Sequence, residues 1–261
     1  MSMRTLRWSR PAMLAIVLAI TYHNIAHASV ILMDESRRVR SSGSVSSVTS
    51  LETWSVEERS PGDFGNFNFE VNETRSAGSN VSSSRGFLQS SITGNLFSAT
   101  GMANASAGVN ETRGNTSVNG NGLSEFAVTF QVLEPTIFNL DGFLAFDPMF
   151  GSPRGSATIT LLSDSFTGAN FRLSFGTSSA FGDFSQNVMV AGLLEPNTYT
   201  LRAFASSSAD AFSLNSTQDG RASFDVNLAL HSAAVPLPAA AWTFGLALTM
   251  LAGFRVRRVK T

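Results

Sequence analysis

Apolar and polar residues alternate with a period of two in short stretches along the chain. In the clearest stretch, Phe126, Val128, Phe130 and Val132 alternate mainly with polar residues. Because successive side chains of a strand point to opposite faces, this period predicts strands with one buried face. Similar stretches lie at residues 67–71, 138–140, 157–161, 171–175, 199–203 and 224–230. No stretch of residues 29–230 has the period of an amphipathic helix.

The predicted strands are short, and the turns between them contain Gly, Pro or Asn, which favours an all-β fold. We expect a single antiparallel β-sandwich, similar to a jelly roll, over residues 29–230. Two turns have related sequences, Leu133–Thr136 and Leu194–Thr198, and each contains Glu-Pro directly before an alternating stretch. Proline suits the first position of a strand because it has no backbone N–H that needs a partner.

Residues 75–122 are rich in Ser, Gly and Asn and contain few large apolar side chains. The pattern leaves open whether this part of the body forms ordered strands or is rich in loops. The pentapeptide Val-Asn-Glu-Thr-Arg occurs twice, at Val71–Arg75 and Val109–Arg113. The two copies fit either two related strands or chance recurrence in a biased composition.

Residues 1–28 have the three parts of a secretory signal peptide. Three arginines (Arg4, Arg7 and Arg10) come first, and the apolar segment 13–20 follows them. The segment then ends in Ala26-His27-Ala28, in which Ala26 and Ala28 are the small residues that signal peptidase requires. We therefore expect Ser29 to be the first residue of the mature chain.

The last 27 residues, 235–261, follow a short predicted linker, 231–234, and predict a membrane helix. They begin with Val235, Pro236, Leu237 and Pro238, continue through an apolar run to residue 254, and end with Arg255, Arg257, Arg258 and Lys260. About 20 apolar residues suffice to cross a bilayer as a helix. A basic cluster directly after such a span marks the cytoplasmic side.

In this order, the Val-Pro-Leu-Pro motif, the apolar run and the basic end resemble the PEP-CTERM sorting signal of Gram-negative bacteria. Leu237 stands where that signal usually has glutamate. The resemblance implies that an exosortase, a membrane-embedded cysteine protease, recognises and removes the tail. It also implies that the body then reaches the cell surface or the extracellular matrix, often in bacteria that make exopolysaccharide. An ordinary C-terminal membrane anchor is the alternative.

The chain contains no cysteine, which excludes disulfides, thiol nucleophiles and Cys-ligated metals. Its formal net charge is −1, but seven of the 18 basic residues lie in the two terminal segments. The body therefore carries 11 basic residues against all 19 acidic ones, a net charge of about −8. This balance argues against nucleic acid or an anionic membrane surface as its partner.

Candidate catalytic groups are few. After removal of the signal peptide, His231 is the only histidine, and it lies in the predicted linker, which leaves no Cys–His dyad and no multi-histidine metal site. The carboxylate pairs considered for glycoside cleavage are Asp141 with Asp147 and Asp164 with Asp183. Acids at turns more often accept hydrogen bonds from the local backbone.

Two further groups of side chains were considered for ligand binding. Asp210, Asp219 and Asp225 are acids that calcium could use, but they lack the spacing of an EF-hand or nonapeptide loop. Phe181 and Phe184 could stack on sugars, although phenylalanine in a sandwich is more often part of the core. We therefore predict no catalytic residue, no metal and no cofactor.

The terminal segments and the lack of a catalytic constellation thus predict an exported, non-enzymatic protein. The resemblance of the tail implies that an exosortase processes it and that it becomes a surface or extracellular-matrix protein associated with exopolysaccharide in a biofilm. Its expected partners are signal peptidase, an exosortase-type membrane protease, the inner membrane in passing, and exopolysaccharide. Two other classes remain open. One is a carbohydrate-binding module, in rare cases a carbohydrate-active enzyme, and the other is a permanently anchored protein that faces the periplasm.

Overall fold

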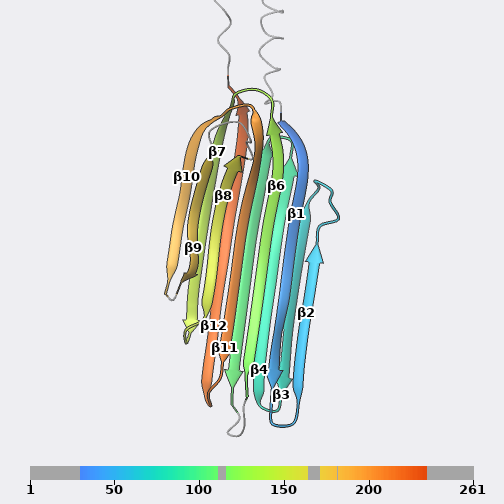
Figure 1. The fold of residues 1–261 in the computed structure, drawn as a ribbon, viewed down its shortest axis with the longest axis vertical. Coiled ribbons are helices and arrows are strands. Elements are labelled where there is room, and N and C mark those ends of the chain that lie inside the picture. Colours follow the sequence, from blue (N-terminus) through green and yellow to red (C-terminus); the bar gives the residue numbers. More distant parts are fainter. Residues whose placement is uncertain (1–29, 111–115, 164–170, 181, 234–261) are drawn as a thin grey trace, which may run out of the picture. The chain divides into compact units, whose positions relative to one another are not determined.

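A computed structural model describes residues 30–110, 116–163, 171–180 and 182–233 of the chain. These residues form two antiparallel six-stranded sheets, called sheet A and sheet B, that pack face to face (Figure 1). The described residues contain no helix, and therefore none that could cross a membrane. The prediction that the body is an all-β antiparallel sandwich is confirmed.

Twelve strands make up the two sheets. Sheet A has the order β2-β1-β6-β11-β8-β9, and sheet B has the order β10-β7-β12-β5-β4-β3. The strands are β1 (Val30–Ser46), β2 (Leu51–Arg59), β3 (Phe67–Ala77), β4 (Asn80–Thr93), β5 (Leu96–Val109), β6 (Val118–Val132), β7 (Thr136–Phe150), β8 (Arg154–Ser163), β9 (Arg172–Ala180), β10 (Phe184–Leu194), β11 (Asn197–Ala211) and β12 (Ser216–Ser232).

Eight of the strands pair as one long hairpin that has been folded over. β8 pairs with β9, β7 with β10, β6 with β11 and β5 with β12, so the pairs are nested around the β8–β9 connection. Successive pairs alternate between the sheets, with β6·β11 and β8·β9 in sheet A and the other two in sheet B. This is the connectivity of a jelly roll.

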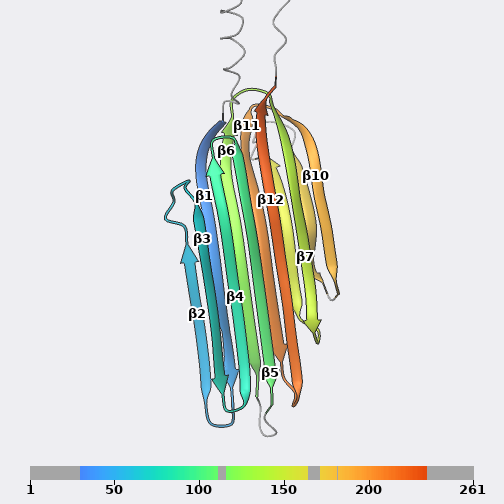
Figure 2. The same cartoon turned by 180° about the vertical axis from the view of Figure 1, so that it is seen from behind.

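The remaining four strands widen both sheets on one side (Figure 2). β1 and β2 continue sheet A beyond β6, and β4 and β3 continue sheet B beyond β5. β1 pairs with β6 from Val30↔Val132 to Val45↔Val118, with one irregularity between Leu32 and Asp34. The outermost strands of the sandwich are therefore β2 and β9 in sheet A and β3 and β10 in sheet B.

Two crossings between the sheets lie side by side and use the two Glu-Pro turns. Residues 133–135 join β6 to β7, and residues 195–196 join β10 to β11. The strand ends that flank these crossings pair with each other, as Val132 does with Asn197. The repeated Leu-Glu-Pro sequence therefore marks two equivalent corners of the jelly roll, directly before β7 and β11 as expected.

Tyr199 closes the corner before β11. Its hydroxyl donates a hydrogen bond to the Glu195 carbonyl oxygen at 2.8 Å, and its ring stacks on Phe130 with centroids 5.9 Å apart. The Phe171 ring packs edge-on against the Tyr199 ring, with centroids 5.9 Å apart. Burial and the nearby Glu195 carboxylate raise the pKa of Tyr199 above its ordinary value of 10.0. The phenol therefore stays protonated and keeps donating this hydrogen bond at neutral pH.

Large apolar side chains fill the sandwich near these corners. They come from both sheets and include seven phenylalanines that are at most 2% exposed: Phe67, Phe97, Phe126, Phe130, Phe138, Phe146 and Phe224. A second, smaller apolar cluster, which contains Val45, Trp54 and Val118, lies farther along the strands. Between the two clusters the inward-facing residues are almost all Gly, Ala or Ser.

The two sheets approach each other closely in this region of small residues. A Cβ atom built on Gly86 of β4 would lie 2.5 Å from the carbonyl oxygen of Leu123 and 3.0 Å from that of Arg40, both in sheet A. A Cβ atom on Gly120 of β6 would lie 2.6 Å from the carbonyl oxygen of Ser83 in sheet B. The facing backbones are therefore in contact, whereas sheets separated by ordinary side chains pack about 10 Å apart.

Serine hydroxyls connect the sheets across the same region. Ser41 Oγ of β1 donates to the Ser84 carbonyl oxygen at 2.9 Å, and Ser84 Oγ donates back to the Ser42 carbonyl oxygen at 3.2 Å. Ser82 Oγ donates to the Asn119 carbonyl oxygen at 2.8 Å. Since a buried hydroxyl without a partner would cost free energy, these bonds make serine suitable for the interior.

One ion pair is buried between the sheets. Arg37 of β1 is 1% exposed, and its Nε and Nη2 donate to the two carboxylate oxygens of Glu35 at 2.7 and 3.2 Å. Most of its other contacts go to the segment between β2 and β3, where the guanidinium donates to the Gly65 carbonyl at 2.5 Å, to Ser60 Oγ at 3.0 Å and to the Asp63 carbonyl. It also donates to Ser90 Oγ of β4 at 3.5 Å and lies 5.3 Å from the centroid of the Phe67 ring. Arg37 thus fastens this crossing to the interior, and both buried charges are compensated.

The Ser- and Gly-rich segment 75–122 contains β4, β5 and the start of β6, apart from residues 111–115, which lie outside the described part. Its small residues form the contact between the sheets. The first Val-Asn-Glu-Thr-Arg copy lies in β3, and the second begins at Val109, the last residue of β5. β4 lies between β3 and β5, so Val109 does not pair with the first copy, and residues 111–113 of the second copy lie outside the described residues.

We predict that Gly86→Ala lowers the free energy of unfolding by ~1–3 kcal/mol, because its Cβ would push on backbone atoms that cannot rotate away. Gly94→Ala, in the β4–β5 turn, is the control, because nothing lies within 4 Å of the Cβ it would add. Urea unfolding of both variants checks this. Equal stability of the two variants would contradict the close contact between the sheets.

Candidate functional site

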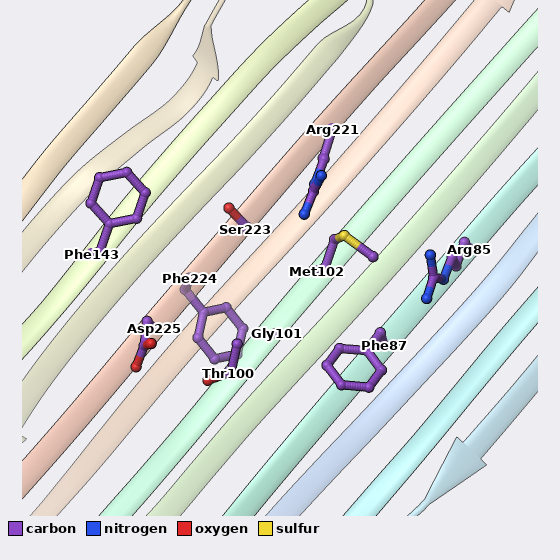
Figure 3. A pocket seen from close by; sticks show the side chains of 10 residues that line it. All are labelled: Arg85, Phe87, Thr100, Gly101, Met102, Phe143, Arg221, Ser223, Phe224 and Asp225. Carbon is purple, nitrogen blue, oxygen red and sulfur yellow. The ribbon is translucent and has the colours of Figure 1, made fainter.

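A shallow trough lies on the outer face of sheet B and encloses about 350 Å³. Four neighbouring strands, β4, β5, β12 and β7, contribute its lining (Figure 3). Their inward-facing residues are buried in the core, so the lining comes mainly from the alternate, outward-facing positions. The sequence pattern of each strand predicts which residues face outward, but only the strand order brings them together.

Apolar side chains form the sides and part of the floor of the trough. Phe87, Met102 and Ser223 are direct partners in one row across β4, β5 and β12. Phe143 of β7 lies beyond this row and is 41% exposed (Figure 3). Neighbouring strands are about 4.8 Å apart, which places the backbones of Phe87 and Phe143 about 14 Å from each other. The trough therefore has a phenyl ring on each side.

Charged side chains lie at the two ends of the trough. Arg221 and Asp225 precede and follow Ser223 by two residues on β12 and are both exposed. Arg85 is held by Glu70, with Nε and Oε1 2.8 Å apart. Within the described part of the chain, Arg221 and Asp225 form no hydrogen bond or ion pair through their side chains. One donor group and one acceptor group are therefore available to a ligand.

Of the two carboxylate pairs considered for glycoside cleavage, the structure describes both members of one, and it does not bring them together. Asp141 and Asp147 both point outward from β7, six residues apart, which is about 20 Å along a strand. Glycosidases hold their two carboxyl groups about 5–9.5 Å apart. Asp183 is exposed in the turn before β10, and Asp164 lies outside the described residues.

A different acidic pair, which sequence reasoning missed, involves Asp219 of β12 and Asp147 of the neighbouring strand β7. Burial and the negative charge of Asp147 raise the pKa of Asp219 above its ordinary value of 3.8. A raised acid pKa means that this group lowers stability once the pH rises above the unfolded-state value. Only the pairing of β7 with β12 places these carboxylates near each other.

The three acids considered for calcium do not form a site. Asp210 points outward from sheet A, whereas Asp219 and Asp225 point outward from sheet B. Within the described ranges, no group of three His, Cys, Asp or Glu side chains could hold a metal ion. Phe184, considered for sugar stacking, packs against the apolar core, and Phe181 lies outside the described residues.

Charge is distributed unevenly between the two outer faces. Six of the body's arginines point outward from sheet A: Arg38, Arg40, Arg59, Arg154, Arg172 and Arg202. Five acids point outward from sheet B: Glu70, Asp141, Asp147, Asp219 and Asp225. Arg85 and Arg221 also point outward from sheet B, and Glu57, Glu125 and Asp210 point outward from sheet A. The face that holds the trough is therefore the more acidic of the two, which disfavours anionic ligands there.

The terminal site residues cannot be placed in the fold. Ala26, Ala28 and all residues of the predicted sorting signal lie outside the described residues. β12 extends to Ser232, so His231 belongs to the last strand, where it is exposed, and not to a linker. The sequence placed the end of the last strand two residues too early because the apolar alternation stops at Leu230.

No protein-family model matches this chain, and no curated protein matches it. Among solved structures, the enzymatically active domain of tailspike protein 4 of bacteriophage CBA120 aligns with a TM-score of 0.24 and 18% identity, over 56% of this chain and 19% of that chain. The structure of infectious bursal disease virus, Gx strain, aligns with a TM-score of 0.29 and 10% identity, over 79% of this chain and 58% of that chain. The structure of TmCBM61 in complex with β-1,4-galactotriose aligns with a TM-score of 0.21 and 14% identity, over 49% of this chain and 82% of that chain.

The chain thus spans about a fifth of the tailspike chain and somewhat over half of the viral one. TM-scores of 0.21–0.29 describe partial overlap of β-sheets and carry no argument about function. The functional account therefore depends on the chain's own residues.

Proposed function

We propose that this chain is an exported surface or matrix protein without enzymatic activity, which an exosortase-type protease releases from a C-terminal sorting signal. One observation carries the proposal: the limits of the fold coincide with the two expected processing regions. β1 begins at Val30, two residues after Ala28, and β12 ends at Ser232, three residues before Val235. Loss of both terminal segments would therefore remove none of the twelve described strands.

The residues around the motif support processing at this place. Proline does not fit the interior of a helix, so Pro236 and Pro238 favour an extended segment between the sandwich and the apolar run 239–254. An extended backbone is the form in which proteases bind their substrates. The basic residues after the run would hold its end on the cytoplasmic side of the inner membrane, with the motif on the outer side.

The body has features that suit a protein outside the cell, because its fold does not depend on disulfides. It has no cysteine, so oxidation cannot scramble disulfides, and its stability comes from a continuous core and long paired strands. Asp141 and Asp147, one of the two acid pairs considered for glycoside cleavage, lie too far apart to act together, as described above. These features support a structural or binding role over a catalytic one.

We predict that the double variant Pro236→Ala, Pro238→Ala keeps its tail and stays with the membrane, whereas the wild-type chain is released without it. The reason is that the alanines extend the helix through the recognition motif. Intact-mass analysis of secreted and membrane fractions measures the outcome. Leu237→Glu is the matched control, because it restores the more usual Val-Pro-Glu-Pro motif and should be processed.

A wild-type extracellular chain that still carries residues 235–261 would contradict the sorting proposal. A wild-type chain that resists alkaline extraction from inner membranes, and never appears outside them, would instead establish the permanently anchored alternative.

A second candidate function is carbohydrate binding, and the trough on sheet B favours it. Phe87 and Phe143 offer apolar faces to the C–H bonds of sugar rings, and Arg221 and Asp225 offer a donor and an acceptor to hydroxyl groups. The excess of acids on this face favours neutral polysaccharides over acidic ones. In this reading the released sandwich would be held in the matrix by exopolysaccharide.

We predict that Phe143→Ala lowers retention on immobilised neutral polysaccharide by about tenfold, because one side of the trough is lost. Phe212→Ala is the matched control, since Phe212 is 70% exposed in the β11–β12 turn, away from the trough. Affinity electrophoresis in gels that contain the polysaccharide checks both. Equal retention of the two variants, or no retention of the wild type, would leave the structural role alone.

A further inference from the structure

Three of the four outermost strands carry features that oppose pairing with another strand. β2 has four charged residues, Glu52, Glu57, Glu58 and Arg59, and β3 has Glu70, Glu73 and Arg75. β9 begins with Arg172, contains Gly176 at φ +107°, and has an irregular register with β8. Charges and bulges on edge strands are the usual protection against unwanted sheet extension.

The fourth outermost strand, β10, has none of these features. Its 11 residues, Phe-Ser-Gln-Asn-Val-Met-Val-Ala-Gly-Leu-Leu, include no charge and no proline. It pairs with β7 in a regular register from Phe184↔Phe146 to Leu194↔Thr136, and no described strand pairs with its other side. It lies at the margin of the sandwich in both views (Figures 1 and 2). The open side of β10 therefore presents backbone groups that pair with no described strand, and Gln186 Oε1 accepts a hydrogen bond from the Gly176 N–H of β9 at 3.1 Å.

The side chains of β10 are also unusually apolar for an outer position. Met189, at its centre, is 85% exposed, and Leu193 is 48% exposed. Ile137 and Phe143 of the neighbouring strand β7 are each 41% exposed on the same outer face. A long, uncharged and apolar edge strand is the kind that other strands join.

We propose that the open edge of β10 pairs antiparallel with β10 of a second copy of this chain, around a twofold axis at Met189. The sequence of β10 is self-complementary in this register. Residues that face the core meet residues that face the core, as in Phe184 with Leu194 and Val188 with Val190, and Met189 meets its own counterpart. No charges oppose each other at any position. Sheet B of one copy then continues into sheet B of its partner.

A second copy is favoured over an unrelated partner because the edge supplies both halves of the interface. An isologous contact needs a strand that matches itself when reversed, and β10 does so over all 11 residues. The charged edge β2 does not, since pairing with its own copy over the full length would place Glu52 opposite Glu58.

Because the chain has no native cysteine, single-cysteine variants test the pairing directly. Directly opposite residues of antiparallel strands have Cα atoms about 4.5–5.5 Å apart, which lies within the range of a disulfide. We expect Met189→Cys in the full-length chain, purified in detergent, to form a disulfide-linked dimer on mild oxidation. Ala191→Cys is the matched control, because the two copies of residue 191 would lie about 13 Å apart.

A second measurement does not depend on oxidation. Met189→Lys places two ammonium groups opposite each other and should weaken the dimer roughly fivefold or more in sedimentation analysis. Leu51→Lys, at an exposed position (67%) on β2, should leave the dimer unchanged. The proposal is overturned if Met189→Cys stays monomeric or links to another protein. It is also overturned if Ala191→Cys cross-links equally well, or if Met189→Lys and Leu51→Lys behave alike.

Discussion

Backbone contact between the two sheets constrains the composition of the Ser- and Gly-rich part of the sandwich. Where Gly86 of β4 faces Leu123, and Gly120 of β6 faces Ser83, a single Cβ atom would force the sheets apart. Only Gly, Ala and Ser can occupy the inward positions there, and serine is tolerated because its hydroxyl reaches a carbonyl oxygen of the facing sheet, as Ser82 reaches Asn119. Close packing of many small groups then supplies dispersion energy that large side chains supply elsewhere.

The rest of the fold is arranged around this contact. The phenylalanine core near the two Glu-Pro corners fills the wider part of the interior, and Arg37 with Glu35 secures the β2–β3 crossing where apolar residues are few. The result is a body held together without disulfides, with its first and last strands beginning and ending beside the expected processing regions. We expect a unit of this kind to keep its structure when both terminal segments are removed, which would be the physical basis of the proposed release.

The sequence predicted strands wherever the inward-facing and outward-facing residues of a strand differ in polarity, as in 126–132 and 224–230. It could not do so for β4 and β5, because inward Ser82 and Gly86 alternate with outward residues such as Ser83 that are equally polar. Arg37 reverses the usual pattern, since a charge faces the core. The trough was missed for another reason: Phe87 and Phe143 are apolar residues on the outside, and only the order β4-β5-β12-β7 makes them neighbours.

Hydrogen exchange of the backbone amides of β4 and β5 tests the central claim, that the Ser- and Gly-rich half of the sandwich is a closely packed part of one folded unit. On the full-length chain, we expect amides between Ser82 and Ala107, outside the β4–β5 turn, to exchange as slowly as those of the phenylalanine-rich strand β6. Both would then exchange only through global unfolding. Exchange of the β4 and β5 amides within minutes, while β6 stays protected, would show that the small residues do not hold the sheets together.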